Sequence, residues 1–309
     1  MERARIYTGH KSVSTRAWNA QTRDFDRAIQ HKLKGTWHGL RRYFLPPRSG
    51  MVKFKGPENR LTVYRTDQCL SRKPLKLLIS FTSSEWFCKV NLNNYSQIYR
   101  GKFVQLGLSN YTAFEVAEIV MTCKYNNWVR PTIYQGMYNA ITRSLERELI
   151  PACKRYGLDV VVYNPIAGGL FSGKYKSKDI PTTGRYSDAV GTMGEMYRKR
   201  YFKDSTFEAL KIVEPVVAKH SLTMVETALR WLVNHSALNI KDGNDGIIIG
   251  VSSLDQLDEN LRDCEKGPLP EEVVQALDKA WAVSIAETPN YWHLDLKYTY
   301  DTRKALFGK

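Results

Sequence analysis

Polar side chains stand at the ends of two apolar, strand-like runs. Ser109 and Asn110 close the run 102–109, and Gln135 is expected to end the next strand, within the run 132–138. Amide side chains supply both hydrogen-bond donors and acceptors. Parallel α/β folds bind their ligands at the carboxyl ends of the strands. The pattern therefore indicates a ligand site, and the alternative is a set of polar strand ends that bind nothing.

A glycine-bearing segment, 164–174, follows a third strand-like run at 158–163. Gly168 and Gly169 would let backbone amides approach a ligand closely, Ser172 offers a hydroxyl, and Lys174 adds positive charge. This combination suits a phosphate group. A Gly-Gly turn alone would be weak support for it.

A second possible phosphate-binding feature lies near residue 250. The run 246–252 is the last expected strand, and a helix is expected over 253–264. Ser252 and Ser253 would leave free backbone amides at the positive end of this helix. Gln256 and Asn260 are four residues apart and would share one helix face. Ordinary helix capping by serine is the alternative interpretation.

The elements that must position these residues alternate between strand and helix. Apolar residues recur at helical spacing over 112–126, with Thr112 as the N-cap, and a second helix is expected over 142–156. Strands separated by helices of this length imply parallel strands with right-handed crossovers. Residues 221–234 are predicted to form a packing helix, and 75–81 is the strongest strand candidate in the first hundred residues.

Several long motifs closely resemble the aldo-keto reductases of the aflatoxin-aldehyde-reductase type, namely 101–111, 134–139, 163–175, 195–201 and 250–261. The resemblance covers residues 101 to about 293 and is specific because the motifs occur in the right order. It implies an α/β fold, a (β/α)8 barrel of the TIM type with an incomplete first half. Residues 101–309 would form its last four β/α units and the C-terminal tail, and residues 1–100 a divergent, basic, partly disordered N-terminal part.

The resemblance also implies NADP as the cofactor. Ser109, Asn110 and Gln135 would hydrogen-bond the nicotinamide carboxamide, and Ser252 with Ser253 would receive the 2′-phosphate that distinguishes NADP from NAD. The resemblance implies further contacts in the loop that wraps the pyrophosphate and around the adenine. These residues are Asn164, Pro165, Ile166, Ala167, Gly168, Gly169, Leu170, Phe171, Ser172, Gly173, Lys174, Arg185, Gly250, Gln256 and Asn260.

Two residues resemble those that line the substrate mouth, Tyr197 and Arg200. Arg200 could pair with a carboxylate or a polar carbonyl in a bidentate manner. Basic residues on a helix are more often solvated. His220 and His235 have no second ligand at metal spacing, so they are interpreted as structural and no metal site is predicted.

Members of the family catalyse with Asp, Tyr, Lys and His. Tyr7 matches the tyrosine, Glu2 stands where the aspartate belongs, and Lys32 is the candidate lysine. No histidine occurs around 77–80, and the β/α unit before Tyr7 is missing. Loss of such partners typically costs about 10²–10⁴-fold in rate. The sequence thus predicts an NADP-dependent reductase of an aldehyde or ketone, in detoxification or secondary metabolism. The alternative is an impaired barrel remnant that binds NADP or a partner without turnover.

Charge is distributed unevenly, since residues 1–100 carry +14 of the formal net charge of +15. Aromatic residues interleave with this charge, but no recognised nucleic-acid module accompanies it, so a nucleic-acid partner is not expected. The five dispersed cysteines suit a reducing, cytoplasmic setting. No apolar run is long enough to span a membrane, and no secretory signal is present. The expected partner is a small carbonyl compound, and the resemblance suggests a homodimer.

Overall fold

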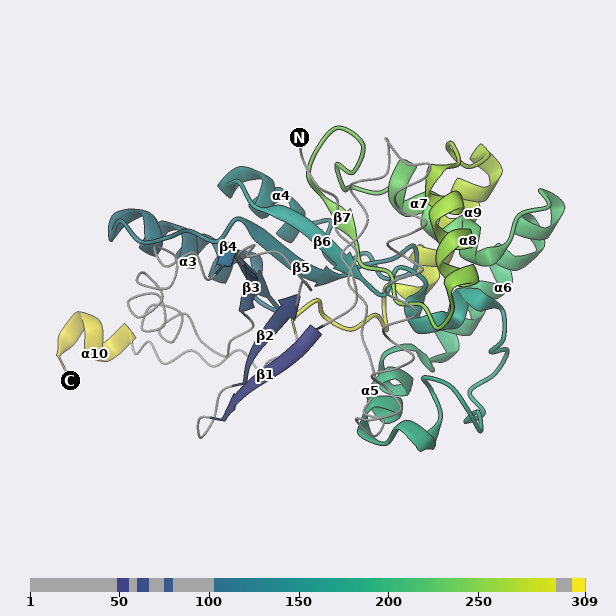
Figure 1. Ribbon diagram of the computed structural model, residues 1–309, viewed down its shortest axis with the longest axis horizontal. Helices are drawn as coiled ribbons and strands as arrows, with labels where there is room; N and C mark the ends of the chain where they lie inside the picture. The colour runs from purple at the N-terminus through teal and green to yellow at the C-terminus, as the bar shows by residue number, and fades with distance from the viewer. Residues whose placement is uncertain (1–48, 56–59, 67–74, 80–102, 293–301, 309) are drawn as a thin grey trace.

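A computed structural model describes residues 49–55, 60–66, 75–79, 103–292 and 302–308, whose arrangement is shown in Figure 1. The predicted catalytic residues Glu2, Tyr7 and Lys32 lie outside these described residues.

Two sheets make up the strand content of the described chain. An antiparallel hairpin pairs β1 (Ser49–Lys55) with β2 (Arg60–Thr66). The larger sheet is parallel and has the order β3-β4-β5-β6-β7, built from β3 (Leu75–Ile79), β4 (Phe103–Ser109), β5 (Ile133–Met137), β6 (Asp159–Tyr163) and β7 (Gly246–Ile247). Strands that follow one another in the chain are neighbours throughout. This sequential order is that of a barrel wall, whereas a doubly wound sheet reverses its strand order.

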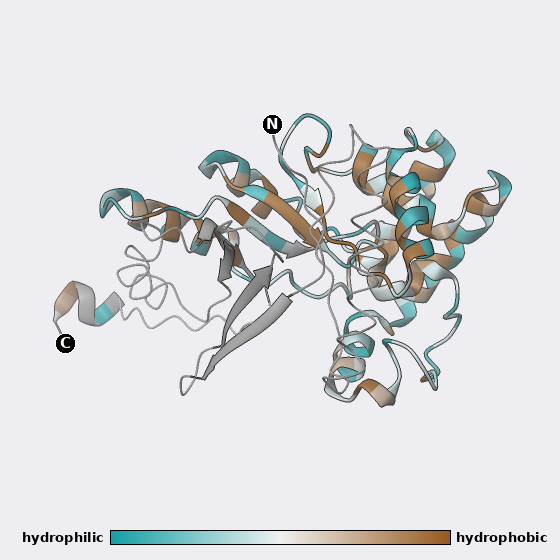
Figure 2. Ribbon diagram, in the orientation of Figure 1, coloured by the Kyte–Doolittle hydropathy of each residue, from teal (hydrophilic) through white to brown (hydrophobic). Residues whose placement is uncertain are grey.

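Helices follow the strands of the parallel sheet, as the crossover argument predicted (Figure 1). They are α3 (Ala113–Tyr125), α4 (Leu149–Tyr156), α5 (Thr192–Tyr201), α6 (Asp204–Lys219), α7 (Met224–Asn234), α8 (Leu254–Glu265), α9 (Glu271–Ser284) and α10 (Thr302–Phe307), with two short 3₁₀ helices, η1 (Ala167–Ser172) and η2 (Asp188–Val190). Figure 2 shows hydrophobic residues along β6 and polar residues on the outer faces of the helices. The core therefore lies between sheet and helices.

Helix α3 begins where its sequence predicts. The Thr112 side chain accepts a hydrogen bond from the Glu115 amide at 3.3 Å, and the Glu115 carboxylate accepts one from the Thr112 amide at 2.8 Å. This reciprocal capping box satisfies amides that have no partner inside the helix. The Tyr291 hydroxyl accepts a further hydrogen bond from the Ala113 amide at 3.0 Å. The segment around Tyr291 therefore contacts the amino-terminal end of the same helix.

The second predicted helix, 142–156, is wrong at its start, because α4 begins only at Leu149. Thr142 exchanges two backbone hydrogen bonds with Asn139, and the Arg143 guanidinium donates to the Ala140 carbonyl at 2.8 Å. These contacts hold the segment in turns. Pro151 has no amide to donate and would clash with the preceding turn of a longer helix.

The last predicted strand, 246–252, is also too long, because β7 ends at Ile247. The Ile248 amide still donates to the Val162 carbonyl at 2.7 Å. Beyond that point β6 turns into a loop, so residues 249–252 find no further strand among the described residues with which to pair.

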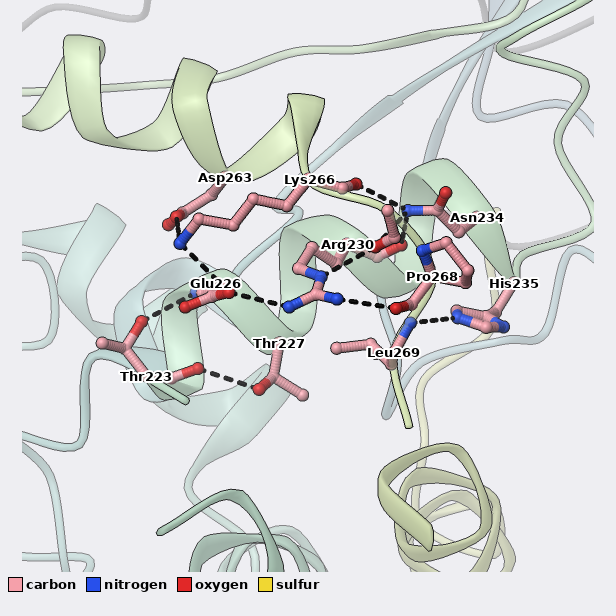
Figure 3. Close-up of polar contacts among 11 residues, drawn as sticks. Thr223, Glu226, Thr227, Arg230, Asn234, His235, Asp263, Lys266, Pro268 and Leu269 are labelled. Atoms are coloured by element: carbon pink, nitrogen blue, oxygen red, sulfur yellow. Dashed lines mark hydrogen bonds and ion pairs between the residues drawn. The ribbon is translucent and has the colours of Figure 1, made fainter. Parts of the chain in front are cut away.

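A buried polar network fixes α7 against the turn between α8 and α9 (Figure 3). The Glu226 carboxylate pairs with Arg230 at 2.8 Å and with Lys266 at 3.1 Å. Burial favours a higher pKa for Glu226, but the ion pairs with Lys266 and Arg230 outweigh it and lower the pKa. Arg230 also donates to the carbonyls of Gly267 and Pro268, at 2.8 and 2.6 Å. The network therefore fixes the position of α8, whose first turn carries predicted site residues.

Within the part of the chain that the structure describes, no helix has both the length and the apolar character needed to cross a bilayer.

Candidate cofactor site

Neighbouring positions of β4 and β5 carry three predicted residues. Ser109 and Gln135 are partners in the parallel register, and the Ser109 hydroxyl donates to the Gln135 carbonyl at 3.0 Å. Asn110 follows at once with a left-handed backbone (φ 68°), a conformation that asparagine tolerates better than most residues. Ser109 is buried, whereas Asn110 and Gln135 are half-buried. The expectation that Gln135 ends its strand is wrong, because β5 continues to Met137. The parallel register still places Gln135 beside Ser109, which Asn110 follows directly.

The loop after β6 has a compact, unusual backbone. Its left-handed positions are Asn164, Ala167, Gly168, Gly169 and Gly173, with φ values between 48° and 107°. Short-range bonds close it, including Ala167 amide to Asn164 carbonyl and Gly169 amide to Ile166 carbonyl, both 2.9 Å. Consecutive turns of this kind can aim backbone amides into one concavity, the type of surface that binds phosphates.

Side chains of the loop divide into an anchoring group and an exposed group. Pro165, Ala167, Leu170 and Phe171 are buried, and the last three belong to the hydrophobic core. Ser172 and Lys174 are exposed. The predicted contacts of the buried residues with a cofactor could therefore come only from their backbone, while Ser172 and Lys174 can reach a ligand with their side chains.

Two tyrosines press against the loop at Gly168. A Cβ atom placed on Gly168 would lie 2.8 Å from Tyr186 Oη and 2.8 Å from Tyr197 Cδ1. The Tyr186 hydroxyl donates to the Ala167 carbonyl at 2.8 Å. Gly168 is required both for its positive φ of 68° and for this close approach.

The predicted substrate residue Tyr197 is buried, and its hydroxyl donates to Asn164 Oδ1 at 3.0 Å. Two guanidinium groups lie over its ring, Arg185 at 5.1 Å and Arg200 at 5.8 Å from the centroid. Arg185 also donates to the Tyr197 hydroxyl at 3.4 Å. The Arg185 Nη2 atom would lie 3.9 Å from a Cβ placed on Gly250. Arg185 therefore reaches from the loop to the β7–α8 connection, joining two halves of the predicted cofactor groove.

The first turn of α8 shows how its serines are used. The Ser253 hydroxyl accepts from the Gln256 amide at 3.2 Å and caps the helix. Gln256 Oε1 in turn accepts from the Ser252 amide and hydroxyl, at 3.0 and 2.9 Å. Gln256 is exposed but Asn260 is buried, so the two do not present equal access to a ligand despite their spacing. The capping interpretation is thus correct, and the expectation of a free Ser252 amide is wrong, because this amide donates to Gln256 Oε1. Ser252 itself is exposed beside the positive end of α8.

The shifted tyrosine pKa values in the described segments all move upward. Burial raises the pKa of Tyr201 to about 12, and burial also raises the pKa values of Tyr134, Tyr138, Tyr186 and Tyr291. A proton donor that works at neutral pH needs the opposite shift. These phenols are therefore suited to holding structure by hydrogen bonds.

The two histidines that the structure describes, His220 and His235, serve as hydrogen-bond partners. His235 Nε2 accepts from the Leu269 amide at 2.8 Å, and His220 pairs with Glu272 at 2.8 Å. The described residues contain no group of three or more His, Cys, Asp or Glu side chains that could hold a metal ion.

Two residues at the site were missed by the sequence analysis, Asn139 and Tyr201. Both contact Asn164, at 3.1 and 3.3 Å. Each lies at the end of a family-like motif, but periodicity alone gave no signal for either. Their contribution depends on tertiary contacts that bring β5, β6 and α5 together.

The sequential parallel sheet, with a left-handed loop after β6 and a capped helix after β7, is typical of α/β barrels, a class whose ligand sites lie at the carboxyl ends of the strands. Residues 93–282 match the model of the aldo/keto reductase family. The match includes most of the chain, so the chain belongs to the aldo/keto reductase family. The fold of this family is a (β/α)8 barrel, which confirms the predicted fold class.

Among its relatives is the human aldo-keto reductase family 7 member A3, 47% identical over 199 residues, or 62% of this chain and 59% of the relative. The mouse aflatoxin B1 aldehyde reductase member 2 is 47% identical over 199 residues, covering 62% and 53% of the two chains. The chain thus spans between about half and three-fifths of these relatives. An oxidoreductase of Leptosphaeria maculans, sirO, is 29% identical over 293 residues, covering 94% and 84%.

Proposed function

We propose that the chain is an NADP-dependent oxidoreductase that reduces an aldehyde or a ketone to an alcohol. The observation that carries this proposal is the cradle at Gly168, where a left-handed backbone is held by Tyr186 and Tyr197 and any side chain would clash. The two tyrosines thereby fix the path of a loop whose consecutive left-handed turns can aim backbone amides at a pyrophosphate. Membership of the aldo/keto reductase family and the names of the two mammalian relatives support the carbonyl substrate.

The residues that would hold the cofactor follow from their positions. Asn110 and Gln135 offer amide groups to a carboxamide, and the loop 164–174 with Lys174 and Arg185 offers amides and positive charge to the pyrophosphate. Ser252 and the amino-terminal end of α8 suit a 2′-phosphate, which favours NADP over NAD. When bound, the reduced cofactor would supply the hydride.

The proton chemistry is assigned to residues outside the described ranges. Tyr7 would give its proton to the carbonyl oxygen of the substrate. Lys32 would lower the pKa of that phenol, and Glu2 would hold Lys32. Arg200, half-buried beside Tyr197, would orient a substrate that carries a carboxylate or polar carbonyl. Detoxification or a secondary-metabolite pathway is the proposed setting.

The test uses the purified full chain with NADPH, NADH and 4-nitrobenzaldehyde. We expect quenching of tryptophan fluorescence by NADPH, with a Kd at least about tenfold lower than for NADH, a difference of about 1.4 kcal/mol. We also expect loss of NADPH absorbance that depends on the aldehyde. Absence of NADPH binding by a folded chain would contradict the proposal. Binding without turnover would favour the impaired remnant.

A homodimer and a cytoplasmic location remain predictions from the sequence. Light scattering after size-exclusion chromatography tests the first, and cell fractionation tests the second.

A further inference from the structure

Two residues so far given no role in binding, Asn139 and Tyr201, belong to a buried polar network behind the cofactor loop. Asn139, just after β5, is completely buried. Its Nδ2 donates to the Asn164 carbonyl at 3.1 Å and to the Tyr201 hydroxyl at 3.4 Å, while its Oδ1 accepts from the Ile141 amide at 3.1 Å. Every polar atom of this side chain is therefore committed to a specific contact.

Two tyrosines of α5 hold the side chain of Asn164 from the other direction. The Tyr197 hydroxyl donates to Asn164 Oδ1 at 3.0 Å, and Asn164 Nδ2 donates to the Tyr201 hydroxyl at 3.3 Å. Tyr197 and Tyr201 are four residues apart on α5, so they present their hydroxyls from one helix face. The amide of Asn164 is thus fixed at both ends.

Asn164 is the residue at which the chain leaves β6 and enters the loop. Its backbone is left-handed (φ 58°), and its carbonyl accepts the first turn bond of the loop, from the Ala167 amide at 2.9 Å. Buried hydrogen bonds of this kind are strengthened by the low local dielectric, and an unsatisfied partner is correspondingly costly. The direction in which the loop departs therefore depends on what holds Asn164.

We propose that Asn139 and Tyr201 are positioning residues that set the path of the cofactor loop by holding Asn164. The cofactor part of this inference rests on the function proposed above. Neither residue needs to contact the ligand. Their effect reaches it through the backbone of residues 164–174, and the adenosine end, which binds near α8, stays independent of them.

The test compares Asn139→Ala and Tyr201→Phe with Tyr138→Phe in the full chain. Tyr138 is a matched control because it is equally buried, but its hydroxyl bonds to Glu146 and the Ala237 amide instead of the loop. Titrations use NADPH and adenosine 2′-monophosphate. We expect the NADPH Kd to rise about 5- to 20-fold in both test variants, as for the loss of one or two buried hydrogen bonds. The Kd for adenosine 2′-monophosphate should stay unchanged in all three variants.

A readout without ligand keeps the inference separable from the proposed function. Hydrogen–deuterium exchange of residues 164–174 should accelerate in Asn139→Ala and Tyr201→Phe but not in Tyr138→Phe, even where all three lower the melting temperature. Unchanged loop exchange together with an unchanged NADPH Kd would overturn the inference. If Asn139→Ala does not fold, Tyr201→Phe, which keeps the aromatic ring, decides whether the inference holds. Failure of the wild type to bind NADPH would count against the proposed function, while loop exchange would still decide the positioning role.

Discussion

Gly168 and Gly157 share a left-handed backbone but differ in what surrounds them. A Cβ on Gly168 would lie 2.8 Å from each of two tyrosine side chains, whereas a Cβ on Gly157 would meet nothing within 4 Å. We expect Gly168→Ala to raise the NADPH Kd by more than about tenfold, because both backbone strain and a clash displace the cradle. Fluorescence titration measures this change.

Gly157→Ala, at the end of α4 and outside the loop, is the matched control, since it introduces only the left-handed strain of about 1–2 kcal/mol per residue. It should lower the melting temperature and leave the NADPH Kd within about threefold of the wild type. Equal losses of affinity in the two variants would show that the close approach at Gly168 has no part in binding.

Single site residues could be predicted from the sequence where their position depends only on neighbouring residues in the chain. Asn110 directly follows β4, and such a strand end can be recognised from the apolar run before it. Gln135 could be placed in the next strand, but β5 continues beyond it to Met137. Asn139 and Tyr201 could not be found in this way, because their partner Asn164 is 25 and 37 residues away along the chain. Only the folded arrangement of β5, β6 and α5 shows that they act on the same residue.

Helix α7 is joined to the α8–α9 turn by a buried carboxylate, which makes the docking of these elements sensitive to one side chain. The Glu226 side chain is 9% exposed and Arg230 13% exposed. We expect Glu226→Gln to reduce the free energy of unfolding by about 2–4 kcal/mol, because two cations lose their buried partner. Urea denaturation measures the loss.

The control for this prediction is Glu208→Gln on α6, whose ion pair with Lys211 is exposed on both sides at 59% and 66%. Exposed pairs contribute about 0–1 kcal/mol, so this variant should be nearly as stable as the wild type. If Glu226→Gln were equally harmless, the network of Figure 3 would be peripheral to the docking of α8.

Elements were predictable where their ends are determined locally. The start of α3 depends on Thr112 and Glu115, three residues apart, and sequence reasoning placed it correctly. The start of α4 depends on distant contacts, since Arg143 pairs with Asp278 of α9 at 2.6 Å and lies 4.3 Å from the Trp231 ring of α7. Helical spacing over 142–148 was overridden by these contacts. The end of β7 was likewise decided by its neighbour β6.

Stability of the whole molecule should depend on pH through His235. Burial lowers its pKa, and its Nε2 must be unprotonated to accept from the Leu269 amide. Glu271 and Asp278 act to raise this pKa and Arg230 and Lys241 to lower it. The unfolded chain, with an ordinary value near 6.5, binds the proton more readily, so stability is complete above about pH 6.5 and falls below it.

We therefore expect the wild type to lose about 0.5–1.5 kcal/mol more than His235→Gln between about pH 7.5 and 5.5, which corresponds to one hydrogen bond. Chemical denaturation at the two pH values gives the difference, and common effects of other titrating groups cancel in it. An identical pH dependence in the two proteins would contradict the assigned role of His235.

On the scale of the whole molecule, cofactor binding and catalysis are assigned to different parts of the chain. The described cradle is built from β4 to α8, whereas the proposed acid, Tyr7, lies outside the described residues. Tyr7→Phe should therefore reduce aldehyde-dependent NADPH oxidation by about 10²–10⁴-fold while leaving the NADPH Kd unchanged. Gly168→Ala should have the opposite effect. It should raise the NADPH Kd but leave the rate of aldehyde-dependent NADPH oxidation at saturating cofactor unchanged. Retained turnover in Tyr7→Phe would exclude Tyr7 as the proton donor, and a matching loss of NADPH affinity would show that the N-terminal part helps to form the cofactor site.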